Sequence, residues 1–135
     1  MIERVPTIIL VAIGGLLGAV ARYIVSSMLS DVKPSFLPIP YGTLAVNVIG
    51  SLLLGIIFTM AQMEMIGEWY PLIATGFMGS FTTMSSFAVE TMNLHADHSL
   101  NIALANFMIM MILVMVGAYT GRALAILLFK ESMIG

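Results

Sequence analysis

The chain has 135 residues, of which 60% are hydrophobic and 9% are charged, with a formal net charge of −2 at pH 7. A mean hydropathy of +1.07 excludes an ordinary soluble domain, and the small net charge argues against a nucleic-acid partner. The absence of cysteine excludes disulfides and thiolate metal sites. The composition therefore predicts a single small integral domain of the lipid bilayer.

Four apolar stretches are long enough to cross a membrane as helices. A hydrocarbon core of about 30 Å needs about 20 residues of helix, and residues 7–29, 41–63, 69–93 and 100–129 meet this length. We expect an all-α fold that uses residues 1–135 as one domain of four transmembrane helices. The connections are short and hold most of the charges; the third holds His95, Asp97 and His98. No cleavable signal peptide is expected, because the first apolar run is too long.

The first predicted span combines small residues with one positive charge. Gly14 and Gly18 are four residues apart, a spacing that lets neighbouring helices approach closely, and similar pairs occur in the second and fourth spans. These pairs indicate helix packing. Arg22 lies about two helical turns from the end of its span, where its long side chain can reach the interface. It can also face an aqueous vestibule, where a fixed positive charge would attract anions.

The second predicted span carries a polar face. Thr43, Asn47 and Ser51 recur every four residues and therefore share one side of a helix. Asn47 is the unusual member, because a carboxamide near the bilayer centre must be hydrogen-bonded or hydrated. It can bond a neighbouring helix or offer N–H donors to an ion, and the sequence leaves both roles open.

The third predicted span contains the most informative segment of the chain. Residues 76–87 include five hydroxyl side chains and two glycines in twelve positions. Such a cluster is tolerated at bilayer depth where it is buried in protein or lines a hydrated cavity. We expect an interrupted helix whose freed carbonyls, near Gly79, could hold a hard cation. Glu90 lies further along this span, and a structural and a permeation role remain equally open for it.

Basic residues are spread almost evenly over the two sides of the predicted membrane domain. Arg4, Lys130 and Arg122 would lie toward one side, and Lys33 and Arg22 toward the other. Since Lys and Arg in short loops set orientation, this near balance allows insertion either way. The alternatives are a single orientation fixed by other interactions and an antiparallel homodimer built from both orientations.

Three motifs together resemble the Fluc (CrcB) family of fluoride channels. They are Gly-Gly-Leu-Leu-Gly-Ala-Val-Ala-Arg-Tyr at 14–23, Gly-Thr-Leu-Ala-Val-Asn-Val-Ile-Gly-Ser at 42–51 and the segment 76–90. The resemblance covers the whole chain in length and span number. It implies a dual-topology antiparallel homodimer with two pores that passively exports fluoride ion across the inner (plasma) membrane of a prokaryote, which confers fluoride resistance.

The resemblance also implies positions for the family's functional residues. A structural sodium ion at the dimer centre would be held by the backbone carbonyls of Gly79 and Thr82 from both subunits. The fluoride pore would include Asn47, with Arg22 in its vestibule. The remaining pore positions fall in one short segment, namely Thr83, Met84, Ser85, Ser86 and Phe87.

One pore position departs from the family pattern. The usual Thr-Thr-Phe-Ser is Thr82-Thr83-Met84-Ser85 here, so a thioether replaces the first pore phenylalanine. Methionine is polarizable but lacks the positive ring edge that a phenylalanine can turn toward an anion. We expect the overall function to survive this change, and the sequence leaves open how the anion is held at Met84.

Three other classes of function fit the sequence less well. A small dual-topology drug/proton antiporter would need a titratable carboxylate at the membrane centre, and Glu90 is off-centre in its span. A non-transporting assembly subunit would leave Asn47 and the hydroxyl cluster without a role. An enzyme is not expected, because His95 and His98 have no intramembrane nucleophile beside them.

Overall fold

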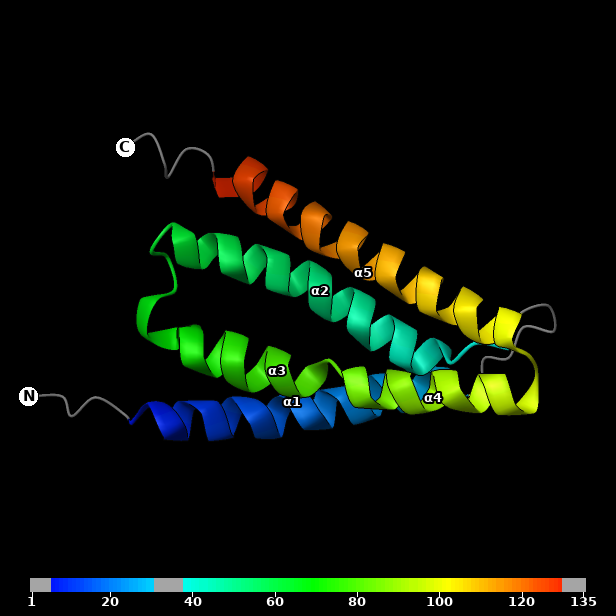
Figure 1. Cartoon of the computed structure of the whole chain (residues 1–135). Helices are drawn as coiled ribbons and strands as arrows, with labels where there is room; N and C mark the ends of the chain where they lie inside the picture. Colours follow the sequence, from blue (N-terminus) through cyan, green and yellow to red (C-terminus); the bar gives the residue numbers. More distant parts are fainter. Residues whose placement is uncertain (1–5, 31–37, 130–135) are drawn as a thin grey trace, which may run out of the picture.

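The computed structural model describes residues 6–30 and 38–129, and these residues are helical throughout apart from short connections. The chain forms α1 (Thr7–Ser30) and α2 (Tyr41–Gln62), and later α4 (Met84–Asp97) and α5 (Leu100–Phe129). Between α2 and α4 lie a single 3-10 turn, η1 (Gly67–Trp69), the π-helix η2 (Pro71–Met78) and the short α3 (Gly79–Phe81). The start of α1 and the end of α5 lie at one end of the molecule, and the α4–α5 connection lies at the other (Figure 1).

Four segments are long and apolar enough to cross a membrane, which confirms the predicted number of spans. They are Thr7–Ser30, Tyr41–Gln62, Gly67–Asp97 and Leu100–Phe129. The third span is longer than predicted, because α4 continues to Asp97. The placement of His95 and Asp97 in a loop was therefore wrong, since both belong to the last turn of α4. Three of the five basic residues in the orientation argument, Arg4, Lys33 and Lys130, lie outside the described residues.

Glycine allows the helices to pack backbone against backbone. A Cβ atom on Gly14 or Gly18 of α1 would collide with the backbone of η2, at Leu72 and Phe77 respectively. A Cβ atom on Gly121 of α5 would collide in the same way with the backbone of Leu52 in α2. These contacts confirm the packing role predicted for the small-residue pairs.

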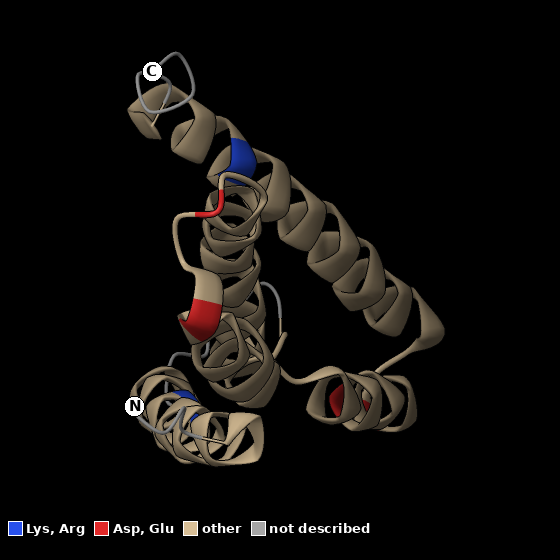
Figure 2. Ribbon diagram, turned by 90° about the vertical axis from the view of Figure 1, so that its left-hand side faces the viewer, with Lys and Arg blue, Asp and Glu red and all other residues tan. Residues whose placement is uncertain are grey.

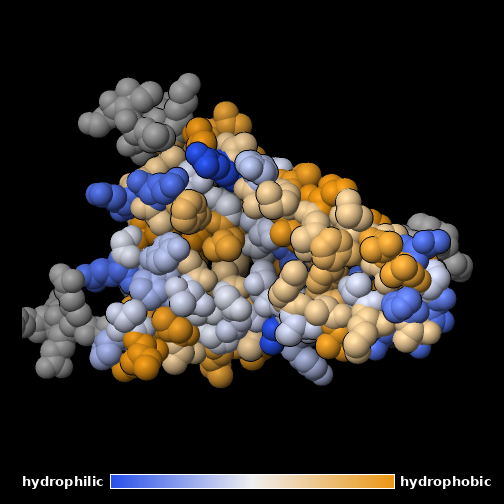
Figure 3. Space-filling model, viewed as in Figure 1, coloured by the Kyte–Doolittle hydropathy of each residue, from blue (hydrophilic) through white to orange (hydrophobic). Residues whose placement is uncertain are grey.

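The surface of the molecule matches a lipid environment along its middle. Large apolar side chains are exposed on every long helix, as at Ile8, Leu16 and Leu127, which are 76%, 68% and 73% exposed. Hydrophilic residues gather mainly toward the two ends of the molecule (Figure 3). Viewed from the end where α1 begins and α5 ends, α5 packs against α2 and α4 and is inclined away from α1 and the first half of the third span (Figure 2). One side of α5 is therefore uncovered by the rest of the chain.

Candidate functional site

The third span is broken at two threonines. Thr82 has φ −78° and ψ 156°, and Thr83 has φ −148° and ψ 109°, so both are extended between α3 and α4. Gly79 itself is helical, with φ −62° and ψ −31°. The structure confirms the predicted interruption and places it three residues beyond Gly79. The Thr83 hydroxyl accepts a hydrogen bond from the Ser86 N–H at 3.3 Å and thereby caps the N-terminus of α4.

Asn47 of α2 holds the broken backbone in place. Its Oδ1 accepts a hydrogen bond from the Thr83 N–H at 2.8 Å, and its Nδ2 donates one to the Thr83 carbonyl at 3.0 Å. Both residues are buried, with 7% and 6% of their surface exposed. The carboxamide oxygen thus replaces the helical acceptor that the Thr83 N–H has lost, and so satisfies a backbone group that lipid could not. The predicted helix-bonding role of Asn47 is therefore present in the structure.

The break also changes the surroundings of two carbonyl groups. In a continuous helix the Gly79 carbonyl would accept from the Thr83 N–H, and the Thr82 carbonyl from the Ser86 N–H. Here the Thr83 N–H donates to Asn47, and the Ser86 N–H donates to the Thr83 hydroxyl. Gly79 and Thr82 therefore both lose their usual helical donor, and these are the two residues that the resemblance singles out for sodium. Backbone carbonyls are hard oxygen ligands, so the donor set fits a hard cation.

Hydroxyl groups gather beside Asn47 at the start of α4. The Thr83 hydroxyl donates to the Ser86 hydroxyl at 3.0 Å and lies 3.4 Å from the Ser85 hydroxyl. Ser85 and Ser86 are exposed, and so is Met84, at 62%. The structure therefore brings Asn47 and these hydroxyls together, with the Met84 side chain pointing away from the packed interior of the chain.

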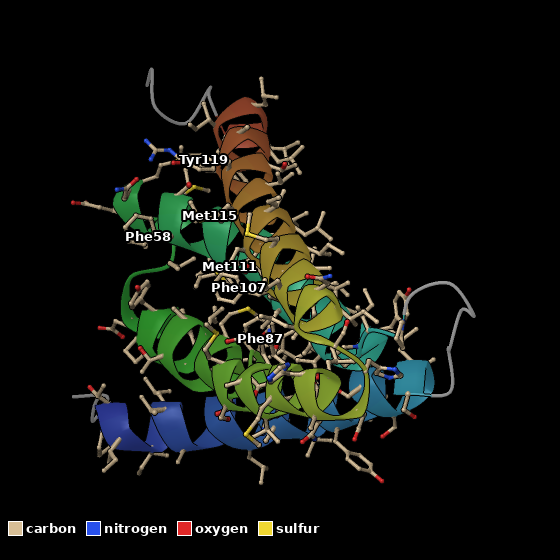
Figure 4. The ribbon with its side chains drawn as sticks, turned by 45° about the vertical axis from the view of Figure 1, so that its right-hand side comes forward. Phe58, Phe87, Phe107, Met111, Met115 and Tyr119 are labelled. Atoms are coloured by element: carbon tan, nitrogen blue, oxygen red, sulfur yellow. The ribbon has the colours of Figure 1, made fainter. Side chains whose placement is uncertain are left out.

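Phe87 is buried inside the chain. Only 2% of its surface is exposed, and its ring stacks on Phe107 of α5 with 6.1 Å between ring centroids. Asn106 donates a hydrogen bond to the Thr91 hydroxyl at 2.8 Å, and Thr91 donates to the Phe87 carbonyl at 2.7 Å. Phe87 and Phe107 face each other where α4 and α5 meet (Figure 4). Side chains of α5 thus hold the first turns of α4 in place.

Two hollows lie at the ends of the polar face of α2. One, of about 710 Å³, is lined by Thr43 and by Glu90, which accepts a hydrogen bond from the Thr43 hydroxyl at 2.7 Å. The other, of about 370 Å³, is lined by Ser51 and Arg122. Asn47 lies between Thr43 and Ser51 on this face and therefore between the two hollows. Arg22, half-buried in α1, lines neither of them.

Sequence reasoning missed the contribution of α5 to this site. Met110 accepts a hydrogen bond through its sulfur from the Asn47 Nδ2, and Phe107 stacks on Phe87. The sequence of the fourth span is almost uniformly apolar, so its apolar pattern does not indicate which side of the helix faces Asn47. Asn106 was the one available signal, as a buried amide that is 1% exposed in the structure.

Comparisons with known proteins agree on one family. The family model described as CrcB-like protein, Camphor Resistance (CrcB), matches residues 9–122. A protein of Magnetococcus marinus named fluoride-specific ion channel FluC is 40% identical over 114 residues, 82% of this chain and 90% of the relative. Proteins of the same name from Hahella chejuensis and Methanocaldococcus jannaschii are 39% and 38% identical, over 89% and 91% of this chain and 94% and 97% of theirs. The chain therefore belongs to the CrcB-like family and is a multi-pass membrane protein.

Proposed function

We propose that this protein is a fluoride-selective, passive anion channel. The observation that carries the proposal is the buried Asn47–Thr83 cluster between two hollows. It occurs in a chain whose relatives are named fluoride-specific ion channels. A passive leak is enough for resistance, because fluoride enters cells as neutral HF and is trapped as the anion at neutral pH. We place the channel in the inner membrane of a prokaryote, where it exports cytoplasmic fluoride.

Selectivity would follow from dense, short hydrogen bonds. Fluoride is small and strongly hydrated, so a conducting site must replace its water with closely spaced donors, and the larger chloride would not reach them. Asn47 provides N–H groups, and Ser85 and Ser86 provide exposed hydroxyls at the start of α4. Phe87 remains our predicted second pore aromatic; in the isolated chain its ring is covered by Phe107. Arg22 remains the predicted vestibule charge.

A second, oppositely oriented copy of the chain would complete the channel. The uncovered side of α5 carries Phe107, Met115 and Tyr119, which are 43%, 54% and 67% exposed. Together with Phe58 of α2, they face the gap between α5 and the third span (Figure 4). Met84 is exposed on the same protomer at 62%. These side chains offer apolar and aromatic area to a homodimeric partner, and the near-even basic count permits the antiparallel arrangement.

Sodium would be a structural ion of this dimer and would not be transported. Two carbonyls from each copy, at Gly79 and Thr82, would give a site of four neutral oxygens, which suits a monovalent cation. The loss of the helical donors to both carbonyls supports this assignment. The ion would offset repulsion between the inward-pointing carbonyl dipoles and add positive potential beside the pores.

A drug/proton antiporter is supported less well by the same structure. As the structure describes them, α1, α2 and α5 contain no Asp or Glu. Glu90 lies in one of the two hollows and is hydrogen-bonded to Thr43. A central proton-coupling carboxylate is therefore missing from three of the four spans.

The test is an efflux assay with purified protein in liposomes, loaded with fluoride or with chloride. We expect rapid fluoride efflux, chloride efflux close to that of protein-free liposomes, and no dependence on a proton gradient. Absence of fluoride efflux from correctly reconstituted protein, or equal rates for the two anions, would refute the proposal.

A further inference from the structure

Both N–H groups of the Asn47 carboxamide have hydrogen-bond acceptors in this structure. Its oxygen accepts from the Thr83 N–H at 2.8 Å, and its nitrogen donates to the Thr83 carbonyl at 3.0 Å. The nitrogen also donates to the sulfur of Met110 at 3.7 Å. A carboxamide nitrogen has two N–H donors, so the backbone and the sulfur occupy both. An anion that is to bind Asn47 must therefore displace one of these acceptors.

The two acceptors differ in how readily they can be displaced. The Thr83 carbonyl is a strong acceptor and belongs to a reciprocal pair of hydrogen bonds with the same carboxamide, so displacing it would also disturb the bond that satisfies the buried Thr83 N–H. A thioether sulfur is only a weak acceptor. If the Asn47 N–H leaves it, the sulfur can stay buried without a hydrogen bond at little cost. The N–H that points at Met110 is thus the one that Asn47 can release.

The position of Met110 is fixed. Its side chain is 1% exposed, among the most buried in the part of the chain that the structure describes. It lies on α5 one helical turn beyond Asn106, whose amide is bonded to Thr91. The sulfur therefore stays beside Asn47 and can satisfy an N–H that would otherwise be buried without an acceptor when no anion is present.

We propose that Met110 is a positioning residue that sets the affinity of the channel for fluoride, by acting as a weak stand-in acceptor for the exchangeable Asn47 N–H. This inference rests on the proposed function. The sulfur keeps the carboxamide oriented and hydrogen-bonded between conduction events. Fluoride, a far stronger acceptor, takes the N–H when it arrives. Because the bound anion must compete with the sulfur, Met110 weakens binding and favours release.

The test replaces the sulfur while keeping the shape of the side chain. Met110→norleucine exchanges sulfur for a methylene, and Met110→Leu is a second variant of similar volume. Without a competing acceptor, the fluoride concentration that gives half-maximal flux should fall roughly threefold, as expected for one weak hydrogen bond. Maximal flux should change much less than this concentration. Met28→norleucine is the control for replacing a methionine sulfur, because Met28 is 74% exposed and lies on α1, outside the proposed site and the proposed dimer surface.

The outcomes separate this inference from the proposed function. A lower half-saturating fluoride concentration in both Met110 variants, with an unchanged concentration in the Met28 control, supports the inference. If the unaltered protein conducts fluoride but the half-saturating fluoride concentration is unchanged or higher in both Met110 variants, the proposed role of Met110 is overturned. The proposed function is then unaffected. Correctly assembled unaltered protein without fluoride flux overturns the proposed function and this inference with it. Gel filtration of each variant establishes that it remains assembled.

Discussion

Asn47 is the residue on which both the structure and the proposed conduction depend. Its side chain braces the backbone of Thr83 through two hydrogen bonds and still has an N–H that a weak sulfur acceptor holds. Asn47→Asp keeps an acceptor for the Thr83 N–H but removes the donors and places a negative charge on the anion path. Like charges a few ångströms apart repel by about 4 kcal/mol at an effective dielectric constant of about 20. We expect fluoride efflux from liposomes to fall on the order of 100-fold or more.

Ser51→Ala is the matched control on the same side of α2. The Ser51 hydroxyl donates to the Asn47 carbonyl one turn back, at 2.7 Å. The Asn47 carbonyl keeps its helical hydrogen bond in α2 when the Ser51 hydroxyl is removed. We therefore expect Ser51→Ala to change fluoride flux little. Wild-type efflux from Asn47→Asp protein that remains assembled would contradict the assignment of Asn47 to the ion path.

Met84 should tolerate the aromatic residue that the family pattern has at this position. The side chain is 62% exposed in the protomer, so a phenylalanine ring meets no packed neighbours within the chain. We expect Met84→Phe to assemble normally and to conduct fluoride at a rate close to that of the unaltered protein. Fluoride efflux and gel filtration of the same preparation measure both properties.

Met110→Phe provides the contrast to this substitution. Met110 is 1% exposed, and inserting a ring into a closely packed site costs about 1–3 kcal/mol. Met110→Phe should therefore lower the unfolding temperature, whereas Met84→Phe should not. Loss of assembly in Met84→Phe would show that a partner subunit packs tightly against the methionine in a way that excludes a ring.

The break in the third span is the element on which the sodium proposal depends. It was predictable as a region, because glycines and hydroxyls at bilayer depth are unsuited to a lipid-facing helix. Its position at Thr82 and Thr83 was not predictable, because it depends on the bonds that Asn47 makes from another helix. The four spans followed from apolar length alone. The partners of Phe87 and Met110 did not, since composition does not fix how each helix is rotated against its neighbours.

Removal of sodium should inactivate the assembled protein. The carbonyls of Gly79 and Thr82 have lost their helical donors, so an unshielded pair from each of two copies would repel. After prolonged dialysis into buffer in which a large organic cation replaces sodium, we expect fluoride efflux to fall, and to return when sodium is restored. Parallel dialysis with sodium present controls for loss of protein. Full activity with no metal detectable by elemental analysis would exclude the sodium site.

At the scale of the whole molecule, the orientation of each copy decides whether the channel can form. The α2–η1 connection lies at the end of the molecule where α1 begins and α5 ends, and the α4–α5 connection lies at the other end (Figure 1). Lysines added to one connection should hold it in the cytoplasm. Gln62 and Met65 are exposed near the first connection, and His95 and Ala96 near the second. Paired lysine substitutions at these sites therefore give two oppositely biased proteins.

Each biased protein should be inactive alone and active with the other. If the channel needs one copy in each orientation, Gln62→Lys with Met65→Lys should insert one way, and His95→Lys with Ala96→Lys the opposite way, so that neither forms antiparallel pairs. Cells without their own fluoride exporter should then grow in fluoride only when both variants are co-expressed, and tags on the N-terminus should report opposite sides of the membrane. The control co-expresses two differently tagged copies of one variant, which should not rescue growth. Full resistance from a single variant shown to insert in one orientation would exclude the antiparallel dimer, because that variant would have assembled a working channel from parallel copies.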